Sequence, residues 1–184
     1  MDVRRTIDLA EDRYAVARTA LSELPLSVVL VGAGSDSERS CATGTAMYVS
    51  FSPPQLAVAL HPGSRTCRLI EERGAFSVSV LRADQVDLAM AAGRGGSSQD
   101  KFAELDVETL ESDELPGMPG LADAAYVIWC RVVERVATGD HRLFVGEVVA
   151  FAGLGDDRPL LRHRRRYAEL GAWLSDTAPE GYPT

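Results

Sequence analysis

The stretch Thr138-Gly139-Asp140-His141 joins two long runs rich in β-branched residues, 126–137 and 142–151. Runs of this composition are typical of β-strands, and a glycine-containing turn between two of them predicts an antiparallel pair. The turn also carries His141, a residue type that changes charge near neutral pH. Because an exposed turn histidine is usually no more than a surface residue, His141 needs support from the rest of the chain.

The clearest strand elsewhere is predicted at 75–81, where large apolar side chains alternate with Ser77 and Ser79. Ser64 is placed to cap a following helix, and Gly74 is placed to end it. The other predicted elements are strands at 26–31, 41–51 and 55–60, helices at 11–24, 65–73 and 84–92, a flexible loop at 93–98 and a mostly irregular segment at 101–119. Since strands and helices do not alternate regularly, the chain is predicted to be mainly β, an antiparallel barrel with short flanking helices.

Composition limits the class of protein. The 184 residues, 46% hydrophobic and 25% charged, predict one globular domain over 1–184 with a core at about 11–170. A net charge of −8 disfavours a nucleic-acid partner, although the basic run 162–166 is either a solvated surface or a site for an anion. Three distant cysteines and three scattered histidines predict no disulfide framework and no metal site. Without a secretory signal or a long apolar run, we expect a cytoplasmic protein that does not enter the membrane.

Two segments have the composition of a ligand site. Ser64-Arg65-Thr66 combines two hydroxyls, a guanidinium and a helix start, which together suit a phosphate group; an ordinary helix cap is the alternative. The segment Ala42-Thr43-Gly44-Thr45 places small residues where a strand usually carries bulky ones. Small side chains let a flat ligand approach the backbone, and a bulge or crowded barrel corner is the alternative here.

Six short motifs in order resemble the short-chain flavin reductases, the reductase components of two-component flavin-dependent monooxygenases. They are Ser52-Pro53-Pro54, Ser64-Arg65-Thr66, the run 74–81, Asp100-Lys101-Phe102, Gly139-Asp140-His141, and Pro159-Leu160-Leu161 with Tyr167. The resemblance spans about 18–167. It implies a Greek-key split β-barrel that binds FMN, or FAD, and uses NADH or NADPH to supply reduced flavin to a partner monooxygenase. It also implies a homodimer.

The resemblance assigns a role to each matching residue. His141 would face the flavin ring where the nicotinamide stacks, as the catalytic residue. The cofactor-binding residues would be Thr43, Gly44, Thr45, Ser64, Arg65, Thr66, Ser79, Lys101, Phe102 and Tyr167, with the 64–66 turn holding the phosphate.

The chain departs from the family pattern before Pro53-Pro54, where several hydroxyl positions are apolar or glycine. These are Ala42, Gly44, Ala46 and Met47. Fewer side-chain donors remain for a flavin there. Two alternatives therefore stay open: a non-catalytic flavin-binding or carrier protein, and an enzyme of the same barrel that uses a deazaflavin or another ligand.

Overall fold

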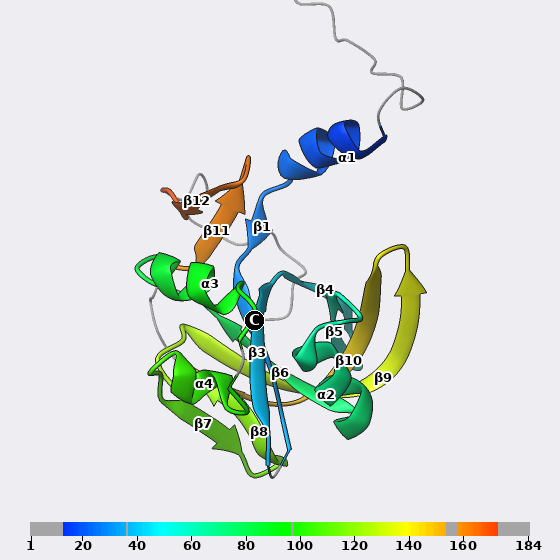
Figure 1. The fold of residues 1–184 in the computed structure, drawn as a ribbon, viewed down its shortest axis with the longest axis vertical. Helices are drawn as coiled ribbons and strands as arrows, with labels where there is room; N and C mark the ends of the chain where they lie inside the picture. The colour runs from blue at the N-terminus through cyan, green and yellow to red at the C-terminus, as the bar shows by residue number, and fades with distance from the viewer. Residues whose placement is uncertain (1–12, 36, 97, 154–157, 173–184) are drawn as a thin grey trace, which may run out of the picture.

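A seven-stranded antiparallel sheet forms the centre of the computed structural model, which describes residues 13–35, 37–96, 98–153 and 158–172 (Figure 1). Neighbouring strands in this sheet all pair antiparallel, so the predicted mainly β, antiparallel barrel is confirmed. In spatial order the strands are β3 (Arg39–Gly44), β2 (Val29–Gly34), β6 (Ala75–Val80), β9 (Tyr126–Thr138), β10 (His141–Ala152), β5 (Pro54–Leu60) and β4 (Ala46–Phe51).

The predicted hairpin around Gly139 is present, with β9 and β10 paired from His141 and Thr138 down to Ala152 and Val127. Two register shifts interrupt this pair, and such irregularities let a long hairpin bend around a barrel. The inward faces of β6, β9 and β10 meet in the main core, where Phe76, Cys130 and Phe144 are fully buried.

The predicted helix after Ser64 is α2 (Arg65–Arg73), and both of its predicted caps are confirmed. The Ser64 hydroxyl accepts a hydrogen bond from the Cys67 amide at 3.2 Å, and Gly74 adopts the left-handed conformation with φ 64°. The helices α1 (Arg13–Ser22) and α3 (Val86–Ala92) lie within the other two predicted ranges.

The single strand predicted at 41–51 is wrong. The chain instead forms β3 and β4, which lie at opposite edges of the seven-stranded sheet. The strand predicted at 26–31 is also divided, into β1 (Leu26–Ser27) and β2, and β2 continues to Gly34. A side-chain pattern identifies extended residues, but it does not identify their pairing partners, which depend on the closure of the barrel.

The segment 101–119 is more regular than predicted. It contains α4 (Lys101–Glu104) and most of a hairpin formed by β7 (Thr109–Ser112) and β8 (Leu115–Leu121). Prolines and glycine in β8 hide the strand pattern in the sequence, but they are tolerated in a short two-stranded sheet.

The β7–β8 hairpin explains why both faces of β6 are buried. The Ser77 hydroxyl donates to the Pro119 carbonyl, and the Leu121 amide donates to the Ser79 hydroxyl at 3.0 Å. The Trp129 indole N–H donates to the Met118 carbonyl at 2.9 Å. The predicted alternation along β6 is therefore present, but the serine face is covered by protein and is not exposed to solvent.

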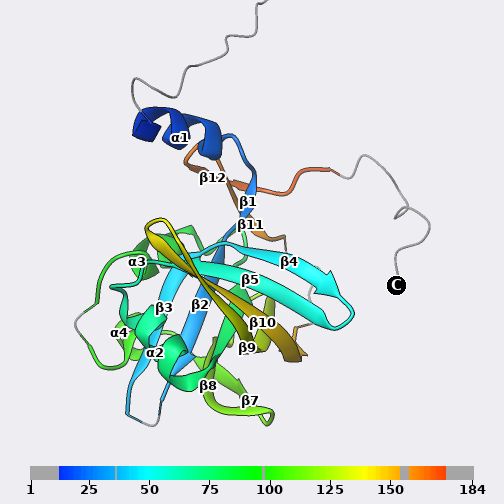
Figure 2. The same cartoon turned by 90° about the vertical axis from the view of Figure 1, so that its right-hand side faces the viewer.

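A small sheet completes the structure at the end of the barrel that carries α1. It pairs β1 with β11 (Leu160–His163) and β11 with β12 (Arg166–Glu169), so the basic run 162–166 lies in this hairpin. Figures 1 and 2 show α1 and this hairpin together, above the body of the barrel. Within the described ranges, no helix is long and apolar enough to span a bilayer.

Candidate functional site

A pocket of about 380 Å³ lies at the start of α2, and we call it the α2 pocket. It is lined by residues 40–42 of β3, 63–66, the loop 92–96 and Lys101. The predicted residues Ser64, Arg65, Thr66 and Lys101 are therefore brought together, although Lys101 is about 35 positions from the others in the sequence.

The N-terminus of α2 supplies hydrogen-bond donors to this pocket. Ser64 satisfies the Cys67 amide, whereas the N–H groups of Arg65 and Thr66 belong to the first turn and have no partner within the helix. The Thr66 hydroxyl lies 2.9 Å from the Ser40 hydroxyl, and both side chains are buried. Free amides, hydroxyls and the positive end of a helix dipole at one place suit a phosphate-sized anion.

Arg65 is held in place by its surroundings. Its Nε lies 3.1 Å from Glu38, and its terminal nitrogens donate to the carbonyls of Ser98 and, at 3.3 Å, Gly96. Glu38 offsets part of the arginine charge, so Arg65 contributes less than a free guanidinium to an anion. The same bonds connect α2 to the loop that forms the opposite wall of the pocket.

Lys101 also lines the α2 pocket, and it holds the loop 92–96 in place. Its Nζ donates to the carbonyls of Ala92 at 2.5 Å and Arg94 at 2.8 Å. Burial lowers the pKa of Lys101, since the charged form loses water that two carbonyls only partly replace. This lysine therefore shapes the pocket and adds positive charge to its floor.

Cys41 also lines the pocket, but its thiol has low reactivity. Burial raises the pKa of its thiol to about 12, so the group stays protonated and is a poor nucleophile near neutral pH. Among the described residues, no cluster of three or more histidine, cysteine or acidic side chains is arranged to hold a metal ion.

A second pocket, of about 440 Å³, lies beside β4, and we call it the β4 pocket. Its lining is residues 25–27, 45–47, 57–59 and Leu143. Residues 40–42 line the α2 pocket and residues 45–47 line the β4 pocket, so one backbone segment connects them. At about 3.3 Å per residue, the span from Ala42 to Thr45 is about 10 Å, with only small side chains along it.

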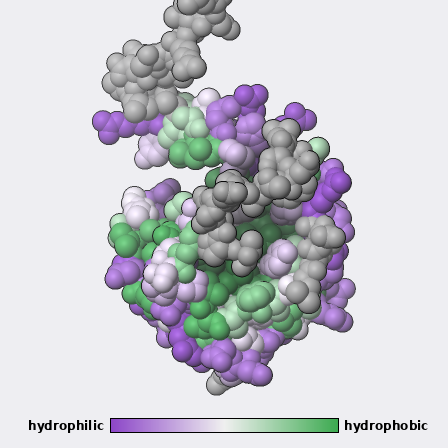
Figure 3. Space-filling view, turned by 180° about the vertical axis from the view of Figure 1, so that it is seen from behind, coloured by the Kyte–Doolittle hydropathy of each residue, from purple (hydrophilic) through white to green (hydrophobic). Residues whose placement is uncertain are grey.

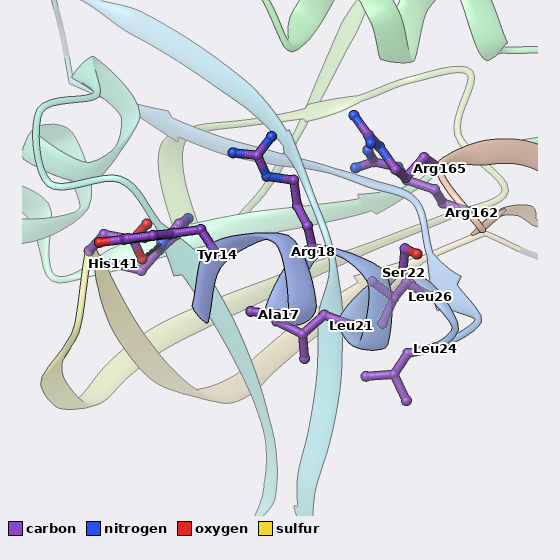
Figure 4. Close-up of a pocket in the computed structure, with 11 residues that line it drawn as sticks. Tyr14, Ala17, Arg18, Leu21, Ser22, Leu24, Leu26, His141, Arg162 and Arg165 are labelled. Atoms are coloured by element: carbon purple, nitrogen blue, oxygen red, sulfur yellow. Dashed lines mark hydrogen bonds and ion pairs between the residues drawn. The ribbon is translucent and has the colours of Figure 1, made fainter. Parts of the chain in front are cut away.

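A third pocket, of about 800 Å³, lies between α1, the β9–β10 turn and the β11–β12 hairpin, and we call it the α1 pocket (Figure 4). His141 and Asp140 form one of its ends, with the His141 Nδ1 at 2.7 Å from the Asp140 carboxylate. This hydrogen bond lowers the pKa of Asp140. Leu26 lines both this pocket and the β4 pocket, so the two pockets lie next to each other.

His61 connects this turn to the α2 pocket. Its ring stands edge-on to the His141 ring with centroids 6.4 Å apart, and its carbonyl accepts from the Ser64 amide at 2.9 Å. The Gly63 amide donates to its Nδ1 at 3.1 Å, which fixes the ring. The sequence shows His61 only as one of three scattered histidines, because the pairing of β5 with β10 that places it beside His141 is a tertiary feature.

Five predicted cofactor-binding residues do not line these three pockets. The Thr43 hydroxyl donates to the Ala89 carbonyl at 2.6 Å, and Ser79 bonds to the β7–β8 hairpin. Phe102 is 1% exposed and belongs to the core beneath α3 and α4. Gly44 is half-buried beside Val31, and Tyr167 packs on the same core as Phe102.

Sequence reasoning did not assign Ser40 or the loop 93–96, which both line the α2 pocket, to the site. Ser40 lies two residues before the segment 42–45 that the sequence singles out for its small residues, and its contact with Thr66 depends on β3 lying next to α2. The loop 93–96 was taken only as flexible. Its glycines were the available signal, since a loop that wraps a ligand needs backbone access.

The sequence is similar to those of known flavin reductases. A family model described as a flavin reductase like domain matches residues 21–171. The reductase component of a 4-nitrophenol 4-monooxygenase/4-nitrocatechol 2-monooxygenase from Rhodococcus opacus is 33% identical, over 92% of this chain and 85% of that protein. The NADH-dependent FMN reductase AsuE2 of Streptomyces nodosus subsp. asukaensis is 30% identical, over 83% of each. An actinorhodin polyketide dimerase of Streptomyces coelicolor is 33% identical, over 83% of this chain and 84% of that protein.

Solved structures show the same fold. The NADH:FAD oxidoreductase SgcE6 of Streptomyces globisporus superposes with a TM-score of 0.82 at 24% identity, covering 93% of this chain and all of that one. The flavin reductase PheA2 superposes with a TM-score of 0.74 at 27% identity, covering 88% and 99%. With the family model matching most of its length, the chain belongs to the flavin reductase-like domain family and has its split-barrel fold.

Proposed function

We propose that this chain is an NAD(P)H-dependent flavin reductase that binds FMN, and FAD less strictly, and supplies reduced flavin to a separate monooxygenase. The observation that carries this proposal is that residues 40–42 line the α2 pocket while residues 45–47 of the same short segment line the β4 pocket. An anion site at a helix start, followed by an open strand and an apolar hollow, matches the shape of FMN. Relatives described as an FMN reductase and as a monooxygenase reductase component support the reaction and the partner.

In this proposal the residues bind and orient. The amides of Arg65 and Thr66 and the Ser64 hydroxyl hold the phosphate, with Arg65 and Lys101 adding positive charge. The small residues from Ala42 to Thr45 admit the ring to the backbone. His141 places the nicotinamide against the ring, from the side of the α1 pocket. When bound, the flavin supplies the hydride chemistry, and the protein supplies orientation and electrostatics.

The direct test is the absorption spectrum of the full chain mixed with FMN, recorded without oxygen before and after NADH or NADPH is added. We expect bleaching of the oxidised flavin band at a rate that increases with protein concentration. Binding of FMN without bleaching by either donor would reject the reductase and support a flavin carrier. Absence of FMN binding at high micromolar concentration would reject both.

A non-catalytic flavin carrier is the second candidate, and one observation favours it. The Thr43 hydroxyl is engaged by the Ala89 carbonyl, while Ala42, Gly44 and Ala46 have no side-chain donor. Fewer groups are then left to orient the ring. The spectrum described above separates this candidate from the reductase.

Replacing Ser64 and Thr66 with alanine should weaken FMN binding more than riboflavin binding. Each charge-assisted hydrogen bond lost to the phosphate costs roughly 1.5–3 kcal/mol, and riboflavin has no phosphate. Fluorescence titration of both ligands measures the difference. Because Ser64 also caps α2, the Ser64→Gly variant serves as a second test, since glycine at an N-cap costs only a few tenths of a kcal/mol. Equal weakening of both ligands would place the phosphate elsewhere.

A homodimer is part of the proposal, and its interface is proposed at β4. This edge strand exposes Met47, Tyr48 and Phe51, and the last two stack with ring centroids 4.8 Å apart. Figure 3 shows apolar side chains gathered on the face of the barrel seen from behind. The other apolar segment, 126–133, offers less surface, because Val127, Trp129 and Cys130 are already buried within the subunit.

Light scattering at micromolar concentration should therefore give a mass near twice 19.8 kDa. The Tyr48→Asp/Phe51→Asp variant should give a monomer, because it places charge where roughly 1.5–3 kcal/mol per buried side chain is otherwise gained. Tyr14→Asp, which changes an aromatic residue that is at least as exposed and lies on α1, is the control and should leave the mass unchanged. A wild-type mass of 19.8 kDa would contradict the dimer.

A further inference from the structure

The α1 pocket has a cationic side that the proposed reduction of flavin does not explain. Arg18 comes from α1, while Arg162 and Arg165 come from the β11–β12 hairpin, and all three line the same cavity of about 800 Å³. Figure 4 shows Arg162 and Arg165 side by side, Arg18 extended from the helix, and His141 at the other end of the pocket. Two segments that are far apart in the sequence thus bring three guanidinium groups to one place.

These three arginines form no ion pair with an acidic side chain among the described residues. In the same hairpin, Arg164 bonds to Glu23 at 2.9 Å. The carboxylate that lines the pocket, Asp140, is bonded to His141 at the far end. The cationic side of the pocket is therefore left without a counter-ion from the described part of the chain.

The hairpin turn adopts a conformation that its residues do not favour. Arg164 and Arg165 have φ of 50° and 64°, in the left-handed region where a two-residue hairpin turn usually has asparagine and glycine. Arginine at these two turn positions adopts this conformation at a backbone cost. Arg165 at this tip lines the pocket together with Arg162 of β11.

Several other residues that line the pocket are apolar or aromatic. Tyr14, Ala17 and Leu21 of α1 line it together with Leu26 of β1. A ligand that fits must therefore combine a flat or apolar part with several negative charges. At the end formed by His141, the same ligand would reach the position that the proposed reductase gives to the nicotinamide.

We propose that the α1 pocket binds the phosphates of the nicotinamide dinucleotide, and that Arg18, Arg162 and Arg165 make the 2′-phosphorylated donor, NADPH, the preferred one. This inference rests on the proposed reductase function and assigns its electron donor. The pyrophosphate of NADH carries two negative charges, which two guanidinium groups can meet. The third guanidinium suits the additional phosphate monoester of NADPH, which arginine contacts through paired donors.

The test uses the full chain and two probes, adenosine 2′,5′-bisphosphate and 5′-AMP, whose binding is measured by calorimetry. We expect the bisphosphate to bind at least tenfold more tightly than 5′-AMP, because its 2′-phosphate adds a charge-assisted contact to arginine. In the Arg162→Ala/Arg165→Ala variant this advantage should disappear. Arg166→Ala removes an arginine from the same run that does not line the pocket, and should keep the advantage.

Steady-state kinetics give a second, independent readout: kcat/KM for FMN reduction by NADPH should exceed that for NADH, and the double variant should lose this preference. Equal affinity for the two probes, or a preference that survives the double variant, would overturn the inference while leaving the reductase intact. A bisphosphate preference lost in the double variant, together with no flavin reduction by either donor, would instead uphold the nucleotide site and overturn the proposed function.

Discussion

Replacing His141 with alanine is expected to slow NAD(P)H-driven flavin reduction by roughly 10- to 1000-fold, as the loss of an oriented polar group does in other active sites. Hydride transfer needs no protein base, so the loss reflects poorer placement of the nicotinamide. Flavin affinity should change by no more than a few fold, since His141 lies on the α1 pocket and not on the α2 pocket. Stopped-flow reduction of flavin-loaded protein measures the rate, and fluorescence titration measures the affinity.

The matched control is His163→Ala. The His163 and His141 side chains are both 45% exposed, but His163 does not line any of the three pockets. The control should reduce flavin at the wild-type rate. An unchanged rate in His141→Ala would make this histidine a turn residue only, and a collapse of flavin affinity would place it against the cofactor.

Replacing Gly146 with alanine is expected to lower the free energy of unfolding by roughly 1–3 kcal/mol. A Cβ at this position would lie 2.6 Å from the Cys130 Cβ and 2.7 Å from two ring carbons of Phe76. Both neighbours are fully buried, so neither can move aside cheaply. For a chain of this length the melting temperature should fall by about 2–4 °C for each kcal/mol.

Denaturant titration and thermal melting of the protein without flavin measure this effect. Gly171→Ala is the control, because a Cβ there meets no atom within 4 Å. A variant with alanine at both positions should resemble Gly146→Ala alone, since the two sites are independent. Wild-type stability in Gly146→Ala would show that β10 shifts freely against β6 and β9, contrary to the tight packing described here.

The local signals in the sequence were accurate where a few adjacent residues decide the conformation. Ser64 and Gly74 fixed both ends of α2, because capping needs only the hydroxyl of one residue and the left-handed freedom of the other. The β9–β10 hairpin was predictable for the same reason, since its turn and its two strands are contiguous. Three of the four residues predicted for the α2 pocket were contiguous as well.

The tertiary structure decided which predicted side chains line a pocket and which make hydrogen bonds within the protein instead. Ser79 and Thr43 look like available hydroxyls in the sequence, but the β7–β8 hairpin and α3 take their hydrogen bonds. The partner of Thr66 was equally hidden, because Ser40 belongs to β3 and contacts Thr66 only where β3 packs beside α2.

Composition and local pattern thus determined the antiparallel β class, the ends of α2 and the motifs of the family. Only the folded chain decided that 41–51 divides between opposite edges of the sheet, that His61 stands beside His141, and that Arg18 joins Arg162 and Arg165. The physical reason is that hydrogen-bonding pattern and side-chain period are properties of neighbouring residues. Strand pairing and pocket lining are instead set by contacts between residues far apart in the chain, which the local pattern of a sequence does not reveal.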